Sequence, residues 1–547
     1  MKTTSCASRI ATAGPDHAPK SAGPAWPAPC RYEDKVSIVD LLCGEFGARC
    51  LTQPEQLARY EIPERGPRGT ALAALLPADE AELQRALALA NAEGFAYVLS
   101  AGRTGLVEAQ RPQGEVVLSL ERFSRPLALE LADGSRCELA SSPSLAAARQ
   151  HLYEWWLVQG KPGLDHAVLH AEAALTIDAA NELLEPLGWM FPLELGASAA
   201  ATVGACVANG SAGANAVCYG TAAHMAHGAA GFWGRAEATP VFSGAAWAQP
   251  ASDVLAIDST RLDLRQGLIG TQGILGVITR VGLRLHAIPV QREAALLPLA
   301  DMNSAMQLFK LARQTFGPDI EEFEFLSRSS LALVKQLHGD GLRLPIAENI
   351  DAPYYALLQL KSVVHDDDLA GRLYAFLSGP AGFADEAIGY APLKNLKRIR
   401  HSVTEASNAR MRALGGGRLS FDTATPVASF GAYLDRLAQE LTALAPDLEF
   451  IAFGHAGIGG AHLHLLGTAA RPVAAMSDEL VRTVFDVTAA HGGTFSAEHG
   501  VGPKWAEEFL RRVPEQRLAE LAEAKRTYDP GLVLQPRSFG MERLLKQ

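Results

Sequence analysis

The sequence predicts an α+β protein of more than one domain, and three observations support this. The chain has 547 residues, more than one ordinary hydrophobic core holds. Helix-like and strand-like segments alternate from about residue 34 onward. Three stretches of very small residues interrupt the first half of the chain, and a histidine-rich stretch stands near its C-terminal end. We therefore expect a ligand-binding first half and a second half with its own sheet.

Composition and charge exclude several classes of protein. Hydrophobic residues make up 48% and charged residues 20%, as in globular enzymes. The net charge of −11 argues against a nucleic-acid partner, which would require a basic face. The seven cysteines are scattered and form no CxxC pair, which indicates neither a disulfide framework nor a thiolate zinc site. No apolar run is long enough to span a bilayer. We expect a cytoplasmic protein, with peripheral contact to the inner membrane left open.

The N-terminal part begins with a low-complexity segment and continues with regular elements. Residues 1–33 are rich in Ala, Ser, Thr and Pro, and lack the apolar core of a secretory signal. We expect a disordered leader there, with a transit peptide as the alternative. Residues 36–47 then predict a helix. Residues 71–106 predict a strand, a helix capped by Asp79, a second strand and a tight turn.

Three segments of small residues recur in the first half, at 101–106, 193–220 and 269–289. Small residues let the backbone approach a ligand closely, and backbone amides in such turns bind phosphate oxygens. Three such segments favour one extended groove around a long, flat ligand. Close packing of the backbone where strands cross explains the same pattern equally well.

Histidines gather in the stretch FGHAGIGGAHLHLL, residues 453–466. His462 and His464 alternate along a predicted strand and therefore share one face. The glycine-rich turn before them predicts a hairpin that brings His455 close to His462. The arrangement predicts imidazole groups converging on one point.

A second stretch, GGTFSAEHGVGPKW, follows a predicted helix and supplies Glu498 and His499. Two histidines and one carboxylate form a common catalytic metal set with an open position. A further histidine beside it is a candidate general base. The alternative is that these histidines are ordinary core or surface residues.

The motifs together resemble a known family over about residues 50–540. AGRTGL, TVGACVANGSAG and GTQGILGVITRVGLRL, in this order, resemble the FAD-binding domain of the vanillyl-alcohol-oxidase type. The two histidine-containing stretches resemble the C-terminal domain of FAD-linked oxidases, and the chain is most similar to the D-lactate, D-2-hydroxyglutarate and glycolate dehydrogenases among them. The resemblance implies a two-subdomain FAD-binding domain, an α+β substrate domain and C-terminal helices. The expected divisions are a leader at 1–33, a FAD-binding domain at 34–288, a substrate domain at 289–490, and a segment closing on the flavin site at 491–547.

The resemblance implies FAD contacts in all three small-residue segments. The chain departs from the family mildly: Arg103, Ala205 and Ser211 stand where the family has glycine, and Gln272 stands where it has glutamate. The expected FAD contacts are Ala101, Gly102, Arg103, Thr104, Gly105, Leu106, Thr202, Gly204, Asn209, Gly270, Gly273, Gly276, Val277 and Ile278. Residues 221–260 follow the family poorly and offer no clear histidine for covalent flavin attachment.

The resemblance also implies a substrate carboxylate site at Arg400 and Thr404, which share a helix face at this spacing. Without the resemblance, a solvated basic helix would explain Arg400 better. Dicarboxylate-specific members carry a lysine where this chain has Ser420. Arg418, on the same strand face, is a candidate replacement, so a dicarboxylate substrate is in doubt.

The implied metal ligands are His455, His462 and Glu498, holding zinc or manganese, with His499 as the base. Ile458 and Gly460 replace an aspartate and an asparagine of the family motif. His464 replaces a second asparagine, either as a further ligand or as a hydrogen-bonding substitute. These changes alter the groups that normally orient metal ligands.

These observations predict FAD-dependent oxidation of a small D-2-hydroxy acid, most similar to D-lactate, to the 2-oxo acid. Hydride would pass to flavin N5 with assistance from a metal and a histidine base. The expected partners are the hydroxy acid and an electron acceptor such as a quinone, a cytochrome or an electron-transfer flavoprotein, with a homodimer left open. The alternatives are a non-redox FAD transferase of the alkylglycerone-phosphate-synthase type and a degenerate flavoprotein.

Overall fold

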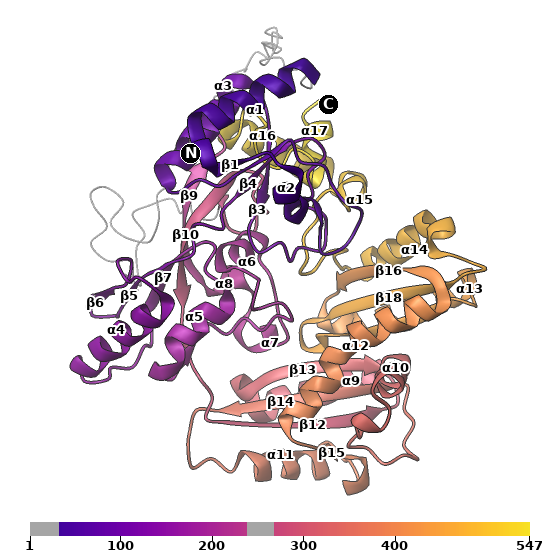
Figure 1. The fold of residues 1–547 in the computed structure, drawn as a ribbon. Helices are drawn as coiled ribbons and strands as arrows, with labels where there is room; N and C mark the ends of the chain where they lie inside the picture. Colours follow the sequence, from indigo (N-terminus) through magenta and orange to yellow (C-terminus); the bar gives the residue numbers. More distant parts are fainter. Residues whose placement is uncertain (1–31, 238–266, 547) are drawn as a thin grey trace, which may run out of the picture.

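The computed structural model describes residues 32–237 and 267–546, so the predicted leader lies almost entirely outside the described residues, as does much of the 221–260 stretch. Within the described parts, strands form sheets of four, five, two and seven members. The first three sheets come from the N-terminal half of the chain and the seven-stranded sheet from the C-terminal half (Figure 1). No helix in these described parts is long and apolar enough to cross a membrane.

The four-stranded sheet is mostly parallel and leads directly into the first glycine-rich turn. Asp79 caps the helix that precedes its edge strand by accepting a hydrogen bond from the amide of Glu82, as predicted. The strands, in sheet order, are β1 (Cys50–Leu51), β2 (Ala73–Leu75), β4 (Val116–Ser119) and β3 (Tyr97–Ser100). The accompanying helices are α1 (Tyr32–Phe46), α2 (Pro54–Glu61) and α3 (Glu80–Glu93).

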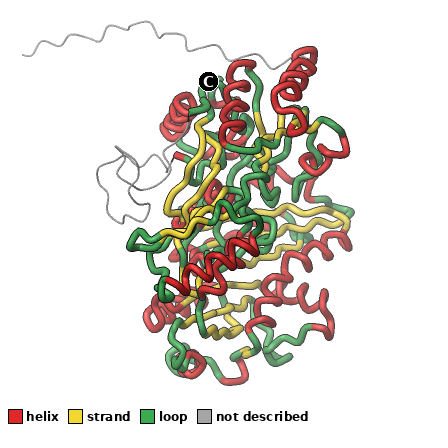
Figure 2. Tube along the Cα trace, turned by 60° about the vertical axis from the view of Figure 1, so that its left-hand side comes forward, coloured by secondary structure: helices red, strands yellow, loops and turns green. Residues whose placement is uncertain are grey.

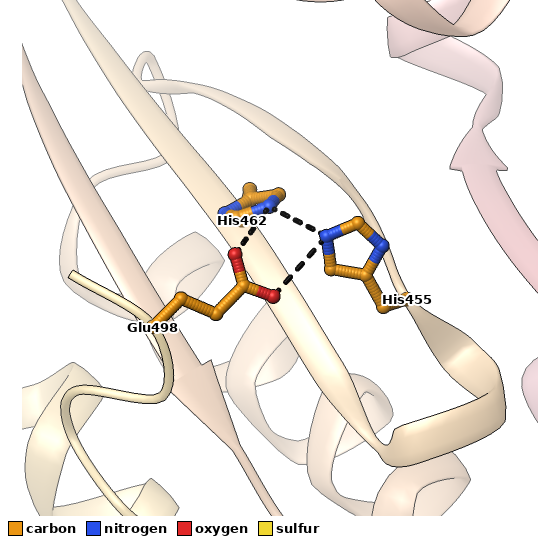
Figure 3. A group of neighbouring side chains, drawn as sticks. All are labelled: His455, His462 and Glu498. Carbon is orange, nitrogen blue, oxygen red and sulfur yellow. Dashed lines mark hydrogen bonds and ion pairs between the residues drawn. The ribbon is translucent and has the colours of Figure 1, made fainter. Parts of the chain in front are cut away.

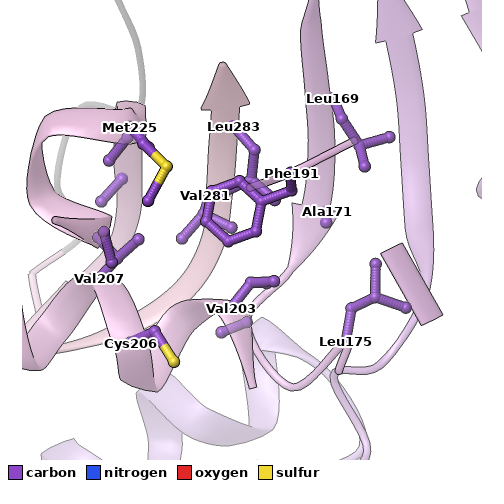
Figure 4. Packing of buried hydrophobic residues seen from close by; sticks show 14 of the residues in the cluster. Leu169, Ala171, Leu175, Phe191, Val203, Cys206, Val207, Met225, Val281 and Leu283 are labelled. Atoms are coloured by element: carbon purple, nitrogen blue, oxygen red, sulfur yellow. The ribbon is translucent and has the colours of Figure 1, made fainter. Parts of the chain in front are cut away.

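The five-stranded sheet is antiparallel, and helices pack on it through one apolar cluster (Figure 4). Its strands, in sheet order, are β6 (Arg136–Glu138), β5 (Pro126–Glu130), β7 (Val168–Glu172), β10 (Gly276–Arg284) and β9 (Ala226–Trp233). The helices are α4 (Leu145–Val158), α5 (Ile177–Leu184), α6 (Val203–Asn209), α7 (Ala216–Tyr219) and α8 (Ala222–Met225). β8 (Trp189–Met190) pairs with β11 (His286–Ala287) in the two-stranded sheet.

The seven-stranded sheet is antiparallel and has helices on both faces, which gives three layers (Figure 2). Successive residues of its strands contribute to different apolar clusters, as the alternation of a strand requires. The strands, in sheet order, are β15 (Gly389–Tyr390), β12 (Gln291–Leu299), β14 (Tyr354–Ser362), β13 (Ile320–Ser327), β17 (Glu449–Gly454), β18 (Gly460–Thr468) and β16 (Gly415–Ala424).

The helices of this half divide between the two faces. α10 (Arg328–His338) and α12 (Leu393–Leu414) share one apolar cluster with the sheet. The other cluster contains α9 (Met302–Phe316), α11 (Leu369–Ser378), α13 (Phe430–Leu444) and α14 (Ser477–Ala490). α12 contacts β16, β18 and β12, so residues along one helix face lie over the strands that carry the histidines.

The C-terminal segment returns to the N-terminal half (Figure 1). It contains α15 (Ala506–Arg512), α16 (Glu515–Tyr528) and α17 (Met541–Leu544). Met541 and Leu544 pack into the cluster of the five-stranded sheet, and Leu534 forms a parallel bridge with Tyr97 of β3. The two ends of the described chain therefore share one half of the molecule.

Candidate active site

A cavity of about 800 Å³ lies where the two halves of the molecule meet. All of the predicted cofactor contacts line it except Gly270 and Val277. Val277 follows Gly276 on β10 and points to the opposite face, where it is fully buried with Phe232 and Val533. The three small-residue segments thus form one wall, and the histidine-containing stretches form another.

The glycine-rich wall leaves no room for larger side chains. A Cβ atom on Gly102 would lie 2.0 Å from the carbonyl oxygen of Ala200, and one on Gly204 would lie 2.4 Å from the Cβ of Ala173. Close packing of backbone against backbone, the alternative weighed from the sequence, therefore contributes to the pattern. The same glycines also line the cavity, so close packing and a ligand groove both describe this wall.

Two buried hydroxyl groups support a bound cofactor at this wall. Ser100 Oγ and Thr202 Oγ1 lack a hydrogen-bond partner among the described residues, and both residues line the cavity. Buried polar atoms normally have a partner, so these atoms indicate a polar ligand. Arg103 has a φ of 58°, in the left-handed region that favours the glycine of the family pattern. These residues fit FAD.

His455, His462 and Glu498 converge on one point (Figure 3). Each offers a ligand atom, and these atoms lie within 4.8 Å of one another. His455 Nε2 is 3.3 Å from His462 Nε2 and 3.2 Å from Glu498 Oε1. β17 and β18 form the predicted hairpin, in which Phe453 lies opposite His462. This register brings His455, which follows β17, close to His462. The donor types and spacing fit a divalent cation.

Glu324 of β13 orients His455, the first of these three potential ligands. Its Oε1 lies 2.5 Å from His455 Nδ1, and its Oε2 accepts a hydrogen bond of 2.5 Å from Arg400 Nε. A ligating histidine usually donates its other ring N–H to a carboxylate, which fixes the ring and its tautomer. Glu324 is fully buried and therefore couples the predicted carboxylate-binding arginine to the predicted metal ligand.

Asp422 of β16 orients Glu498 and His499. Its Oδ2 accepts hydrogen bonds of 2.8 Å from the backbone amides of both Glu498 and His499. The same oxygen lies 3.3 Å from His499 Nδ1. An N–H at Nδ1 facing Asp422 leaves Nε2 of His499 as the atom that can accept a proton. The His499 and His462 rings are stacked with centroids 5.7 Å apart.

Burial and the neighbouring charges together shift the pKa values of this cluster. Burial, with His455 and His499 next, holds the pKa of His462 well below its ordinary value. Burial also lowers the pKa of His499, although Asp422 opposes this. For His455, burial acts to lower the pKa, but Glu324 and Glu498 raise it to about 9. Burial raises the pKa of Glu498 to about 7 against the opposing charge of His455.

The substrate side of the cavity comes from α12 and its neighbouring strands. Arg400 and Thr404 both line the cavity, and the Arg400 guanidinium lies 4.9 Å above the Phe453 ring. Arg400 is buried, so the solvated basic helix considered from the sequence does not describe its surroundings. His464 lies outside the three-residue group and hydrogen-bonds Ser407 through Nδ1 at 2.8 Å.

Sequence reasoning missed Glu324 and Asp422 as orienting residues. The signal for Glu324 was the strand sequence IEEFEF, in which Glu322 and Glu324 alternate with phenylalanines on a strand with both faces buried. A buried acidic residue requires a partner. That partner could not be predicted from the sequence, because Glu324 lies 131 residues from His455.

Comparisons with known proteins agree with this architecture. The family model described as "FAD linked oxidases, C-terminal domain" matches residues 288–538, and that described as "FAD binding domain" matches residues 162–230. The D-2-hydroxyglutarate dehydrogenase of Xanthomonas citri pv. viticola is 25% identical over 496 residues, covering 89% of this chain and 93% of the relative. A Schizosaccharomyces pombe protein, provisionally named a mitochondrial D-lactate dehydrogenase, is 23% identical. The match covers 93% of this chain and 90% of the relative.

Among solved structures, substrate-bound p-cresol methylhydroxylase is similar, with a TM-score of 0.67 and 12% identity, covering 94% of this chain and 98% of the other. At this identity the likeness concerns the fold, which is the vanillyl-alcohol-oxidase-type fold predicted from the sequence. Two parts of the chain therefore match domains of FAD-linked oxidases, and the protein is a FAD-binding oxidoreductase.

Proposed function

We propose that this protein oxidises a small D-2-hydroxy acid to the corresponding 2-oxo acid. The observation that carries the proposal is the position of His499. It lines the same cavity as the glycine-rich wall, beside the three potential metal ligands, with its Nδ1 facing Asp422. A hydroxy acid loses one proton from oxygen and one hydride from C2. The site offers a base for the proton, and the cavity offers room for a hydride acceptor.

The residues of the chain have distinct roles in this proposal. Arg400 binds the substrate carboxylate with the guanidinium nitrogens that Glu324 does not engage, and Thr404, one helical turn later, adds a hydroxyl donor. His499 accepts the hydroxyl proton at Nε2 while Asp422 stabilises the resulting imidazolium. FAD, when bound along the glycine-rich wall, supplies the hydride acceptor. Zinc or manganese, when bound by His455, His462 and Glu498, supplies polarisation of the hydroxyl oxygen.

Substrate identity narrows to two candidates. D-lactate is the expectation from the sequence, and D-2-hydroxyglutarate is the substrate in the name of the Xanthomonas relative. The two differ by a second carboxylate. Reoxidation of the flavin requires an acceptor, for which we propose a quinone, a cytochrome or an electron-transfer flavoprotein.

The test is anaerobic absorbance of the purified holoprotein at roughly 450 nm, where oxidised flavin absorbs. D-lactate, D-2-hydroxyglutarate, glycolate and the L-forms are added in turn. We expect a D-acid to bleach the flavin and its L-form to leave it oxidised. A flavoprotein that no hydroxy acid bleaches would contradict the proposal and favour a non-redox transferase or a degenerate flavoprotein.

A further inference from the structure

Lys397 connects the two halves of the molecule. It lies on α12, and Lys397 Nζ is 2.7 Å from both carboxylate oxygens of Glu194, which belongs to the second small-residue segment. The same nitrogen is 2.7 Å from Glu322 Oε1 on β13. In the described part of the chain, the ion pairs that join residues 32–288 to residues 289–490 all involve Glu194. Glu194, Lys397 and Glu322 together form what we call the clasp.

In the C-terminal half, the clasp lies next to the arginine proposed to bind the substrate carboxylate. Lys397 precedes Arg400 by three residues, so both side chains leave the same face of α12. Glu322 precedes Glu324 by two residues, so both carboxylates leave the same face of β13. The same helix and the same strand are therefore joined by two successive ion pairs. A shift of Lys397 would carry Arg400 with it.

In the N-terminal half, the clasp reaches the wall where we place the cofactor. Glu194 lines the cavity, and a Cβ atom on Gly213 would lie 2.2 Å from the Glu194 carbonyl oxygen. Leu193, the preceding residue, is buried in the apolar cluster of the five-stranded sheet. The backbone of Glu194 is thus packed closely against the rest of its segment, so a displacement of Glu194 would displace this wall.

One ammonium group serves two carboxylates in the clasp. Glu322 is 2% exposed, whereas the side chain of Glu194 is 35% exposed. For Lys397, burial acts to lower the pKa, but Glu322 and Glu194 raise it above its ordinary value, so the ammonium stays charged. Burial raises the pKa of Glu322 to about 7, with Lys397 opposing. The pKa of Glu322 would rise further without Lys397, so the carboxylate would be neutral and a variant that lacks the lysine would avoid an unpaired buried charge.

Other contacts hold the two halves together independently of the clasp. Tyr219 of α7 donates a hydrogen bond of 3.3 Å to Glu321 Oε1, and α7 lies beside β13 (Figure 1). Gln272 accepts a hydrogen bond of 2.9 Å from the amide of Val501. Removal of the clasp should therefore change how the two halves are aligned, and not whether they associate.

We propose that Lys397 is a positioning residue for hydride transfer, because it fixes α12 relative to the cofactor wall through Glu194. This inference rests on the proposed function, in which Arg400 and Thr404 hold the substrate from the C-terminal half and the small-residue segments hold the cofactor from the N-terminal half. Hydride transfer depends on the distance between donor and acceptor, and a displacement of about 1 Å can cost roughly 100-fold in rate. The clasp sets this distance without contacting the substrate.

The first experiment measures the rate of flavin reduction separately from substrate affinity. The holoprotein is mixed anaerobically with increasing concentrations of D-lactate or D-2-hydroxyglutarate, which gives a limiting rate constant and a Kd. Glu194→Ala is the informative variant, because it breaks the link between the halves and leaves Lys397 paired with Glu322. We expect the limiting rate constant to fall about 10- to 100-fold, with the Kd and the FAD content unchanged.

Matched variants separate positioning from folding. Lys397→Met should lower the rate as Glu194→Ala does, whereas Lys397→Arg keeps the charge and the donors and should retain it. Arg410→Met is the control on α12, because Arg410 pairs with Glu449 within the C-terminal half and does not line the cavity. Glu182→Ala breaks an ion pair within the N-terminal half. Both controls should reduce the flavin at the rate of the unmodified protein, and Tm is recorded for every variant.

The second experiment requires no substrate. Hydrogen–deuterium exchange in the holoprotein reports how readily the backbone opens over residues 193–200 and 393–401. Exchange should be faster in both ranges in Glu194→Ala and Lys397→Met, and in neither range in the two controls.

The outcomes separate this inference from the proposed function. If hydroxy acids reduce the flavin of Glu194→Ala at the unmodified rate, or if the rate falls only together with Tm and FAD content, Lys397 is not a positioning residue while the oxidation stands. If no hydroxy acid reduces the flavin of the unmodified protein, the proposed oxidation is wrong. Faster exchange in both ranges then still assigns the clasp as the link that fixes the two walls, and unchanged exchange overturns the clasp as well.

Discussion

Glu324→Gln tests whether the buried carboxylate organises the site. The carboxylate faces two donors, His455 Nδ1–H and Arg400 Nε–H, each at 2.5 Å. A glutamine has the same shape but only one accepting oxygen, and its amide nitrogen is itself a donor. One of the two partners must therefore face another donor in a site without exposure to solvent. The change preserves volume and removes one charge-assisted hydrogen bond together with the negative charge.

The magnitude follows from these contacts. A buried hydrogen bond to a charged group contributes about 1.5–3 kcal/mol, so losing one corresponds to about 10- to 100-fold in an equilibrium constant. Loss of a partner that orients a metal ligand lowers metal affinity by a similar 10- to 100-fold. We expect zinc or manganese affinity, measured by competition with a chelator, to fall by that factor in Glu324→Gln. The rate of flavin reduction should fall with it, and FAD content should be retained.

Glu321→Gln provides the matched control on the same strand. Glu321 is equally buried and accepts hydrogen bonds from Arg292 and Gln359, but does not line the cavity. This variant should lower Tm without changing metal affinity. If Glu324→Gln binds metal and reduces flavin like the unmodified protein, or if both variants lose metal equally, the assignment of Glu324 as the orienting group is wrong.

Two further predictions concern the cofactor and the base. Gly102→Ala should lower the FAD content, because the added Cβ would lie 2.0 Å from a carbonyl oxygen. Gly44→Ala, which has open space around it, should retain FAD. Equal FAD content in the two variants would refute FAD binding at the glycine-rich wall. His499→Ala should slow flavin reduction by about 100-fold or more at unchanged FAD content, with His491→Ala, outside the cavity, as control; a parallel loss of FAD would argue against a base.

Local patterns in the sequence predicted the elements that carry the site. Period-two alternation placed His462 and His464 on one strand face, and the glycine-rich turn correctly predicted the hairpin that brings His455 to His462. Four-residue spacing placed Arg400 and Thr404 on one face of α12. Such patterns depend only on neighbours along the chain, so they are visible without a structure.

The residues that a local pattern could not predict come from other elements. Asp422 reaches Glu498 across 76 residues, and Glu324 reaches His455 across 131. Val277 shows a different limit, because resemblance alone included it among the cofactor contacts although strand alternation directs it into the core. Contacts between residues of different elements depend on how the sheets and helices pack. A local sequence pattern does not predict that packing.

The loop that carries Glu498 and His499 is held from both halves of the molecule. On one side Asp422 of the seven-stranded sheet accepts its backbone amides. On the other, Gln272 of the third glycine-rich segment accepts hydrogen bonds from the amides of Val501 at 2.9 Å and Gly502 at 3.3 Å. A neutral amide oxygen serves these two N–H groups, so the replacement of the family's glutamate preserves the link. The proposed base and one proposed metal ligand are thereby fixed relative to both walls of the cavity, as the proposed hydride transfer would require.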